Sequence, residues 1–168
     1  MRMAGTHRLS YGRRSLAGWL GVSALAPWWL AACSSPPKPV VTPVALNLVA
    51  GPDANPDARG RASPLTVRVY ALKTPAPFEA ADFFSLFEKD QATLGGELVQ
   101  REEMLLRPGE SRKLAMTLSA DVKALAFMAA FRDLDRARWR EVRMLDVGKP
   151  HDLTVTFGAR QISVQPPR

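Results

Sequence analysis

The chain has 168 residues, 46% of them hydrophobic, with a formal net charge of +7 and a single cysteine. This length suits one globular domain with a substantial core, and one cysteine excludes a disulfide framework within the chain. All 16 acidic residues follow Cys33, whereas 4 of the 23 basic residues precede it. The part of the chain from Cys33 onward therefore has a net charge of +3, which is too small to indicate nucleic-acid binding.

The first 33 residues have the order of an export signal: a basic region, an apolar run and then small residues. Residues 16–30 form the apolar run, and the basic residues before it are Arg2, Arg8, Arg13 and Arg14. The run ends in the tetrapeptide Leu30-Ala31-Ala32-Cys33, and together these features resemble a bacterial lipoprotein signal with its lipobox. The resemblance implies that residues 1–32 are removed and that the Cys33 thiol, now on the first residue, carries a diacylglyceryl group.

Three other interpretations of this region stay open. A retained membrane anchor is less favoured, because a spanning helix needs about 20 apolar residues and this run is shorter and contains Pro27. An ordinary secretory signal has the same basic, apolar and small regions, but it does not require the cysteine. The pair Arg13-Arg14 also fits a twin-arginine export signal.

Residues 34–43 (SSPPKPVVTP) contain four prolines and no core-forming pattern. Together with Cys33 they predict a lipidated tether over residues 33–43, stiff and extended. At about 3 Å per residue, the proline-rich part would hold the next domain roughly 30 Å from a membrane. Apolar residues at 44, 46 and 48 then predict a first strand, so we expect the folded domain over residues 44–168.

A polar segment separates this strand from the next one. Residues 51–64 (GPDANPDARGRASP) contain three prolines, two glycines and no large apolar residue, and they predict a long loop. A second strand with one solvated face follows, because Leu65, Val67 and Val69 alternate with more polar neighbours.

The segment at 78–106 predicts a helical insertion. Phe83, Leu86 and Phe87 recur at helical spacing. Glu79 and Asp82 suit the first turn of that helix, where the dipole favours acidic side chains. The pair Gly95-Gly96 ends the helix, and residues 97–106 stay open between a short second helix and an extended segment.

A turn at Pro108-Gly109 precedes a third strand at 114–118. Residues 123–131 are apolar on both alternating faces, which indicates a central strand covered on both sides; a buried helix is the competing interpretation. Phe127 and Phe131 share one face, so we expect them in the core. The other face is mostly alanine and leaves room for the helix that contains Phe83.

Three further short strands are predicted at 142–145, 153–157 and 161–164. Turn signals at 148–150 and at Gly158 separate them. Seven short strands with one helical insertion predict a mainly β fold, a two-sheet β-sandwich.

The residues after Cys33 offer little for catalysis. His151 is the one histidine among them and stands beside a turn, where we expect it to be exposed. Glu102 and Glu103 are adjacent, so a helix or a strand would point them in different directions. The sequence contains no nucleophile elbow, no phosphate-binding glycine loop and no zinc-protease motif. We expect no enzymatic activity, no metal site and no cofactor other than the covalent lipid on Cys33.

Residues 132–140 (RDLDRARWR) are the densest polar segment, with four arginines and two aspartates around Trp139. We favour a solvated turn with surface ion pairs, each of which contributes little stability. The alternative is a contact surface, because arginine and tryptophan are enriched at the energetic centres of interfaces.

Several segments, taken in order, resemble one known family. They are the lipobox, the polar loop at 51–64, the strand RVYALK, and then FEAADFFSLFEKD, LGGELVQREEMLLRPGES and AFMAAFRDLDRARWR. The set is similar to the outer-membrane lipoprotein of bacterial type VI secretion systems, the TssJ family, over nearly all of the mature chain. The resemblance implies a transthyretin-like β-sandwich with a helical insertion, no enzymatic activity and no cofactor.

The resemblance also implies a location, a role and a partner. TssJ lipoproteins anchor the membrane complex at the periplasmic face of the outer membrane by binding the periplasmic domain of the inner-membrane protein TssM. Ser34 after the lipidated cysteine is compatible with sorting to the outer membrane. In that family the loop between the first two strands makes an important part of the contact, and here this loop is 51–64.

The polar side chains of this loop are the expected contact residues. They are Asp53, Asn55, Asp57, Arg59 and Arg61. We expect the loop to contribute little to folding, because it has no large apolar side chain to bury.

Two other classes of function stay open. One is a lipoprotein that binds a small ligand, which a large apolar pocket with a few polar groups would support. The other is a pilot or assembly lipoprotein of a different secretion machine, which a different binding partner would reveal.

Overall fold

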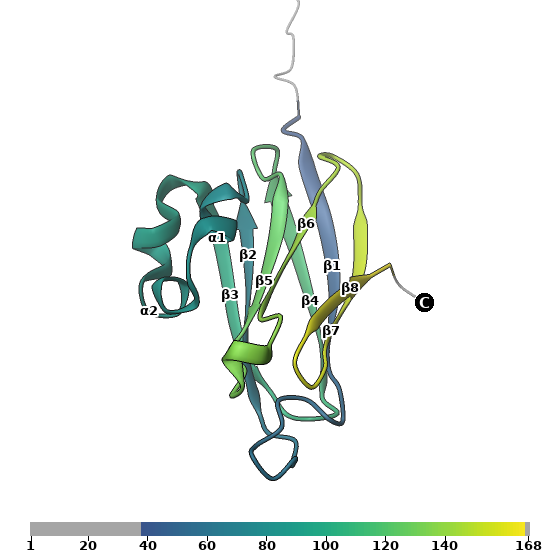
Figure 1. Ribbon diagram of the computed structural model, residues 1–168. Coiled ribbons are helices and arrows are strands. Elements are labelled where there is room, and N and C mark those ends of the chain that lie inside the picture. The colour runs from purple at the N-terminus through teal and green to yellow at the C-terminus, as the bar shows by residue number, and fades with distance from the viewer. Residues whose placement is uncertain (1–37, 167–168) are drawn as a thin grey trace, which may run out of the picture. The chain divides into compact units, whose positions relative to one another are not determined.

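The computed structural model of the protein describes residues 38–166. The expected signal, Cys33 and most of the proline-rich spacer lie outside the described residues. The described chain forms two four-stranded sheets, packed face to face, and a helical insertion covers the outer face of one sheet (Figure 1). This architecture confirms the mainly β, two-sheet sandwich with a small helical insertion.

The two sheets have the strand orders β4-β1-β7-β8 and β3-β2-β5-β6. All neighbours are antiparallel except β1 and β7, which are parallel. The strands are β1 (Val41–Ala50), β2 (Leu65–Leu72), β3 (Leu98–Leu106), β4 (Ser111–Ser119), β5 (Ala124–Ala129), β6 (Arg140–Met144), β7 (His151–Phe157) and β8 (Ile162–Gln165). The helices are α1 (Ala76–Ala80), α2 (Phe83–Leu94) and the short 3-10 helices η1 (Gly95–Glu97) and η2 (Leu134–Arg136).

Strand β1 begins three residues earlier than expected, at Val41, so the spacer is shorter than the predicted 33–43. Pro43 is tolerated inside this strand because β1 pairs with β7 only from Val44 onward, and a proline lacks the N–H that a second neighbour would need. Thr42 is fully buried, and its hydroxyl accepts a hydrogen bond from the N–H of Gly148 at 2.9 Å.

The main core lies between the inner faces of the two sheets. Alternate residues of β1 and β2, including Leu48 and Val67, meet Phe127 of β5 and Phe157 of β7, and all four are fully buried. The period-two patterns read from the sequence therefore place the apolar faces correctly.

Strand β5 is covered on both sides, as the two-sided apolar pattern predicts. Phe127 faces the main core, and Phe131, just beyond the strand, is 5% exposed, so both phenylalanines are core residues. The opposite face presents Ala126 and Met128 to a second, smaller cluster under the insertion. The competing interpretation of this run as a buried helix is wrong.

The helical insertion is shorter than the predicted 78–106. It holds two helices instead of one: Glu79 lies in α1, and Asp82 is the N-cap of α2, where its carboxylate accepts from the N–H of Ser85 at 3.0 Å. Gly95 ends α2 with a φ of 53°, as the glycine pair predicts.

Residues 98–106 form β3, an eighth strand at the edge of its sheet. The open choice for this stretch is therefore resolved as extended. Its alternation was hidden because four long polar residues, 100–103, follow one another across both faces of the strand.

The sandwich has two distinct ends. The chain enters β1 at one end, here called the tether end, which also holds the β4–β5 turn (119–123) and the β6–β7 turn (145–150) (Figure 1). The opposite end, here called the loop end, holds the β1–β2 loop (51–64), the β3–β4 turn (107–110), the β5–β6 connection (130–139) and the β7–β8 turn (158–161). Strand β1 joins the two ends directly.

Candidate functional site

The loop end brings the sequence-predicted contact loop together with the polar segment at 132–140. Backbone hydrogen bonds tie the four connections to one another. Gly51 N–H donates to Phe157 O at 2.8 Å, Gly109 N–H donates to Gly51 O at 3.2 Å, and Arg138 N–H donates to Arg160 O at 2.8 Å. The loop end is therefore one continuous surface, made from segments far apart in the sequence.

The β1–β2 loop is anchored by two small buried residues. Ala54 is fully buried, and Asn55 is only 3% exposed. The Asn55 amide donates to Pro64 O at 2.8 Å, and its carbonyl oxygen accepts from the N–H of Arg132 at 2.8 Å. Asn55 also has a φ of 50°, a left-handed conformation that asparagine adopts more readily than most residues. This one side chain closes its own loop and fastens it to the β5–β6 connection.

The tip of the same loop is closed by Asp57. One carboxylate oxygen accepts from the N–H groups of Arg59 and Arg61 at 2.9 and 3.0 Å, and the other oxygen accepts from Nε of Arg61 at 2.8 Å. The Arg61 N–H, its guanidinium and the Arg59 N–H hold the pKa of the Asp57 carboxyl below its ordinary value. Gly60 completes the turn with a φ of 78°.

The structure divides the five expected contact residues into two groups. Asp53, Arg59 and Arg61 are exposed, whereas Asp57 is half-buried and holds the turn. Asn55 is buried and has both of its polar groups engaged within the fold. Of the five expected contact residues, the exposed ones are therefore Asp53, Arg59 and Arg61. Because Ala54 and Asn55 are buried, we expect these two residues to contribute more to folding than the rest of the loop.

The segment at 132–140 has features of both interpretations, the solvated turn with ion pairs and the exposed contact surface. Asp133 accepts from Nε of Arg160 at 2.8 Å and lies 4.0 Å from Arg136, so the expected ion pairs are present. Trp139 is half-buried and packs against both cores, with its ring 5.3 Å from that of Phe83. Arg132 and Arg136 remain exposed beside the β1–β2 loop.

A hollow of about 770 Å³ opens between these loops. Its charged lining residues are Asp53, Asp57, Arg132, Asp133, Arg136 and Arg160. The hollow is polar and open, so it suits the side chains of a protein surface better than an apolar small molecule.

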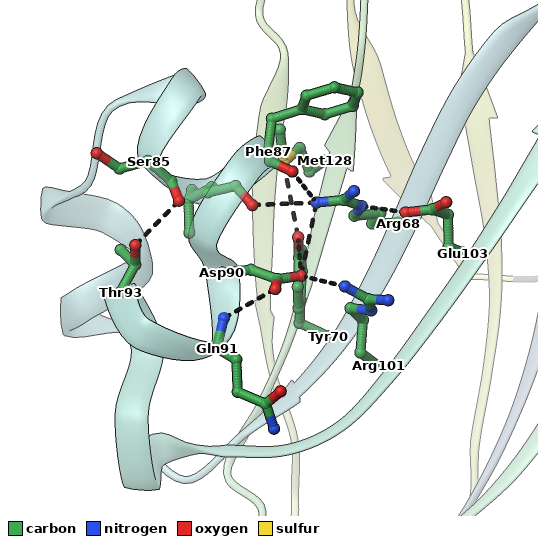
Figure 2. A network of polar contacts seen from close by, with 11 residues as sticks. Arg68, Tyr70, Ser85, Phe87, Asp90, Gln91, Thr93, Arg101, Glu103 and Met128 are labelled. Carbon is green, nitrogen blue, oxygen red and sulfur yellow. Dashed lines mark hydrogen bonds and ion pairs between the residues drawn. The ribbon is translucent and has the colours of Figure 1, made fainter.

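A second polar cluster fixes the insertion to its sheet (Figure 2). Asp90 of α2 accepts from Arg101 of β3 at 2.7 Å and from the Tyr70 hydroxyl at 3.4 Å, and it lies 3.5 Å from Arg68. The Arg68 guanidinium also pairs with Glu103. Burial raises the pKa of the Tyr70 hydroxyl above its ordinary value.

Arg68 also stabilises a break in α2. Its NH1 group donates to the carbonyl oxygens of Leu86 and Phe87 at 3.0 and 2.9 Å, just before Lys89 departs from helical geometry. Sequence alternation places Arg68 on the solvated face of β2, but α2 covers that face. Every buried side-chain nitrogen and oxygen atom in the described part of the chain has a hydrogen-bond partner, so this cluster is a satisfied structural network.

Other sequence-predicted groups lie apart from these clusters. His151 is half-buried at the start of β7, where its Nε2 accepts from the N–H of Asp146 at 3.0 Å. Among residues 38–166, no three His, Cys, Asp or Glu side chains are grouped to hold a metal, and no helix is long and apolar enough to cross a bilayer.

The fold and the loop end together define an interaction domain: a β-sandwich that presents a folded, arginine-rich loop surface on a rigid core. Residues 42–160 match the family described as "Type VI secretion lipoprotein, VasD, EvfM, TssJ, VC_A0113". The chain belongs to this family of type VI secretion lipoproteins. No curated protein matches the sequence.

Solved structures agree with this assignment. The chain is similar to the type VI secretion lipoprotein TssJ1 from Pseudomonas aeruginosa, with 44% identity and a TM-score of 0.74 over 76% of this chain and 97% of that one. It resembles a chain of a type VI membrane complex, with 26% identity and a TM-score of 0.65 over 74% and 98% of the two chains. A chain in a structure described as the TssM C-terminal domain from EAEC shares the fold, with 24% identity and a TM-score of 0.63 over 74% and 98%.

Proposed function

We propose that acyl chains on Cys33 hold this protein at the periplasmic face of the outer membrane, and that its loop end binds the periplasmic domain of the inner-membrane protein TssM. In this role the protein docks the membrane complex of a type VI secretion system. It acts as an attachment point, without enzymatic activity and without a cofactor beyond its covalent lipid.

The arrangement of the two ends of β1 is the observation that carries this proposal. The anchored segment enters at Val41, and the contact loop leaves at Ala50, at the opposite end of the same strand. A lipid anchor before β1 therefore leaves the loop end free to face a partner across the periplasm. Membership of the type VI lipoprotein family supports TssM as the partner. One of the similar chains belongs to a structure described as the TssM C-terminal domain, which supports the same partner.

The test uses the exposed part of the β1–β2 loop and leaves its anchors intact. We expect the double variant Asp53→Ala with Arg59→Ala to bind the TssM periplasmic domain at least tenfold more weakly, about 1.4 kcal/mol. Its melting temperature should stay unchanged, because neither side chain is buried and Ala54, Asn55 and Asp57 are retained. Calorimetric titration measures the affinity.

Arg143→Ala is the matched control, since Arg143 is an exposed cation near the tether end of β6. It should bind with unchanged affinity. A folded double variant that binds as well as the unaltered protein would move the interface away from this loop, and Arg132 and Arg136 would be the next residues to replace.

A further inference from the structure

The basic residues at the two ends of the folded domain differ in type: lysine predominates at the tether end, where Arg143 is also exposed, and arginine predominates at the loop end, near which Lys113 is exposed on β4. The whole chain contains six lysines, and four of them lie at the tether end: Lys38, Lys73, Lys123 and Lys149. The four connections of the loop end contain no lysine; their basic residues are Arg59, Arg61, Arg107, Arg132, Arg136, Arg138 and Arg160.

This division matches two different kinds of contact. Arginine is enriched in protein interfaces and lysine is depleted there, so the loop end has the composition of a protein-binding surface. Lysine is a compact point charge on a flexible apolar stem. It reaches phosphate groups while its stem covers apolar surface, so the tether end has the composition of a lipid-facing surface.

Apolar side chains are exposed beside these lysines. Val40, Val41 and Met144 are 55%, 43% and 58% exposed. These side chains lie near the β6–β7 turn: Val40 lies against Gly148 of that turn, and β6 ends at Met144 just before it. Two of the lysines pair with acids, Lys73 with Asp121 and Lys149 with Asp146. These pairs are exposed and weak, and within residues 38–166 Lys38 and Lys123 have no ion-pair partner.

The length of chain before this end limits its distance from a lipid on Cys33. Four residues lie between Cys33 and Lys38, and the five steps along the chain, at about 3.3–3.6 Å each, reach at most about 18 Å. This limit is shorter than the roughly 30 Å expected for the whole of residues 34–43, because β1 already begins at Val41. The tether end is therefore the part of the sandwich that must stay close to an anchoring bilayer.

We propose that the tether end is a membrane-contacting surface, in which the lysines bind anionic lipid headgroups and Val40, Val41 and Met144 lie at the level of the headgroups. This inference rests on the proposed lipid anchor. Contact through this end sets the orientation of the sandwich, because β1 then points its loop end away from the bilayer.

A site-specific probe tests the contact in the acylated protein. The chain has no cysteine besides Cys33, so a cysteine introduced elsewhere is the one thiol open to labelling once Cys33 is acylated. Met144→Cys, labelled with a fluorophore, is placed in vesicles of phosphatidylethanolamine and phosphatidylglycerol. Brominated lipids should quench this label, and aqueous iodide should not. Leu105→Cys is the matched control, because Leu105 is 53% exposed and lies near the loop end of β3.

The lysines are tested in the same labelled protein. Lys38→Gln and Lys123→Gln should each lower the ratio of docked to undocked protein about fivefold, as expected for one charge near an anionic surface. Vesicles of phosphatidylcholine alone should show a larger loss, because every lysine of the tether end then lacks an anionic headgroup. Vesicle flotation reports separately whether the acyl anchor itself holds.

Two results would overturn the inference. One is a Met144 label as open to iodide as the Leu105 label in protein that floats with the vesicles. The other is protection that appears only after the TssM domain is added, which would assign this end to a protein partner. Protein that fails to float would instead contradict the lipid anchor of the proposed function.

Discussion

Among single residues, Asn55 links two segments of the loop end. Its amide group joins the β1–β2 loop to Arg132 of the β5–β6 connection, and its left-handed backbone sets the direction of the loop. The exposed neighbours Asp53 and Arg59 therefore depend on Asn55 for their positions.

We expect Asn55→Ala to lower the free energy of unfolding by about 1–3 kcal/mol, because it leaves a carbonyl and an N–H group without their partner. Alanine also tolerates a positive φ less well than asparagine. Urea unfolding measures the change. Asn47→Ala, at a half-buried position in the middle of β1, is the control and should be nearly neutral. Equal stability of the two variants would show that water replaces the Asn55 hydrogen bonds.

Asp90 has the corresponding role at the insertion. It is 7% exposed and accepts from Tyr70 and Arg101 while lying next to buried Arg68. Removing its carboxylate takes the acceptor from the Tyr70 hydroxyl, whereas Arg68 keeps its ion pair with Glu103.

We expect Asp90→Ala to lower the free energy of unfolding by about 1–3 kcal/mol, because the buried Tyr70 hydroxyl loses its carboxylate partner. Hydrogen exchange should become faster throughout α2. Asp82→Ala is the matched control on the same helix, where loss of an exposed N-cap costs about 0.5–2 kcal/mol. If both variants lose the same stability, the Asp90 network contributes no more than a helix cap.

At the scale of elements, β5 is the strand on which both cores depend. Its inner face packs between the sheets, and its outer face packs under α1 and α2. A substitution on either face therefore changes the packing of a buried cluster and is expected to lower the stability of the domain.

Phe127→Ala should lower the free energy of unfolding by about 3–5 kcal/mol, because it leaves a cavity in the main core. Phe84 on α2 is 61% exposed, and Phe84→Ala should stay within about 0.5 kcal/mol of the unaltered protein. Thermal melting compares the two. An unchanged melt for Phe127→Ala would contradict the position of this ring in the core.

The elements differ in how well the sequence predicts them. Strands β1, β2 and β5 follow from apolar alternation, because one or both of their faces are buried. Strand β3 lies at a sheet edge and carries polar residues on both faces. Its extended conformation is therefore determined by pairing with β2, and its own sequence pattern does not predict it.

The site shows the same limit. The position of the contact loop is readable from its prolines and glycines, but the burial of Asn55 depends on Arg132, 77 residues away. The role of Arg68 likewise depends on where α2 packs. Both contacts are long-range, and nothing in the local sequence encodes them.

At the scale of the whole molecule, the proposed lipid on Cys33 predicts where the protein is found. We expect Cys33→Ser to leave an unprocessed or soluble form, because the acyl chains that give firm membrane attachment are lost. Fractionation of membranes after a salt wash measures this. Ser34→Ala should remain in the outer-membrane fraction and serves as the control. A Cys33→Ser variant that also remained there would show that the anchor lies elsewhere in the chain.

Strand β1 has a mechanical consequence for a molecule held at one end and pulled at the other. Force applied between Val41 and the β1–β2 loop acts along the axis of β1, between its neighbours β4 and β7. The hydrogen bonds to β4 lie across that axis, so the load acts on them in shear and they share it. If the edge strand β8 is instead pulled away starting at Gln165, its hydrogen bonds to β7 break one at a time. Single-molecule stretching should therefore show a higher rupture force along β1 than for the peeling of β8.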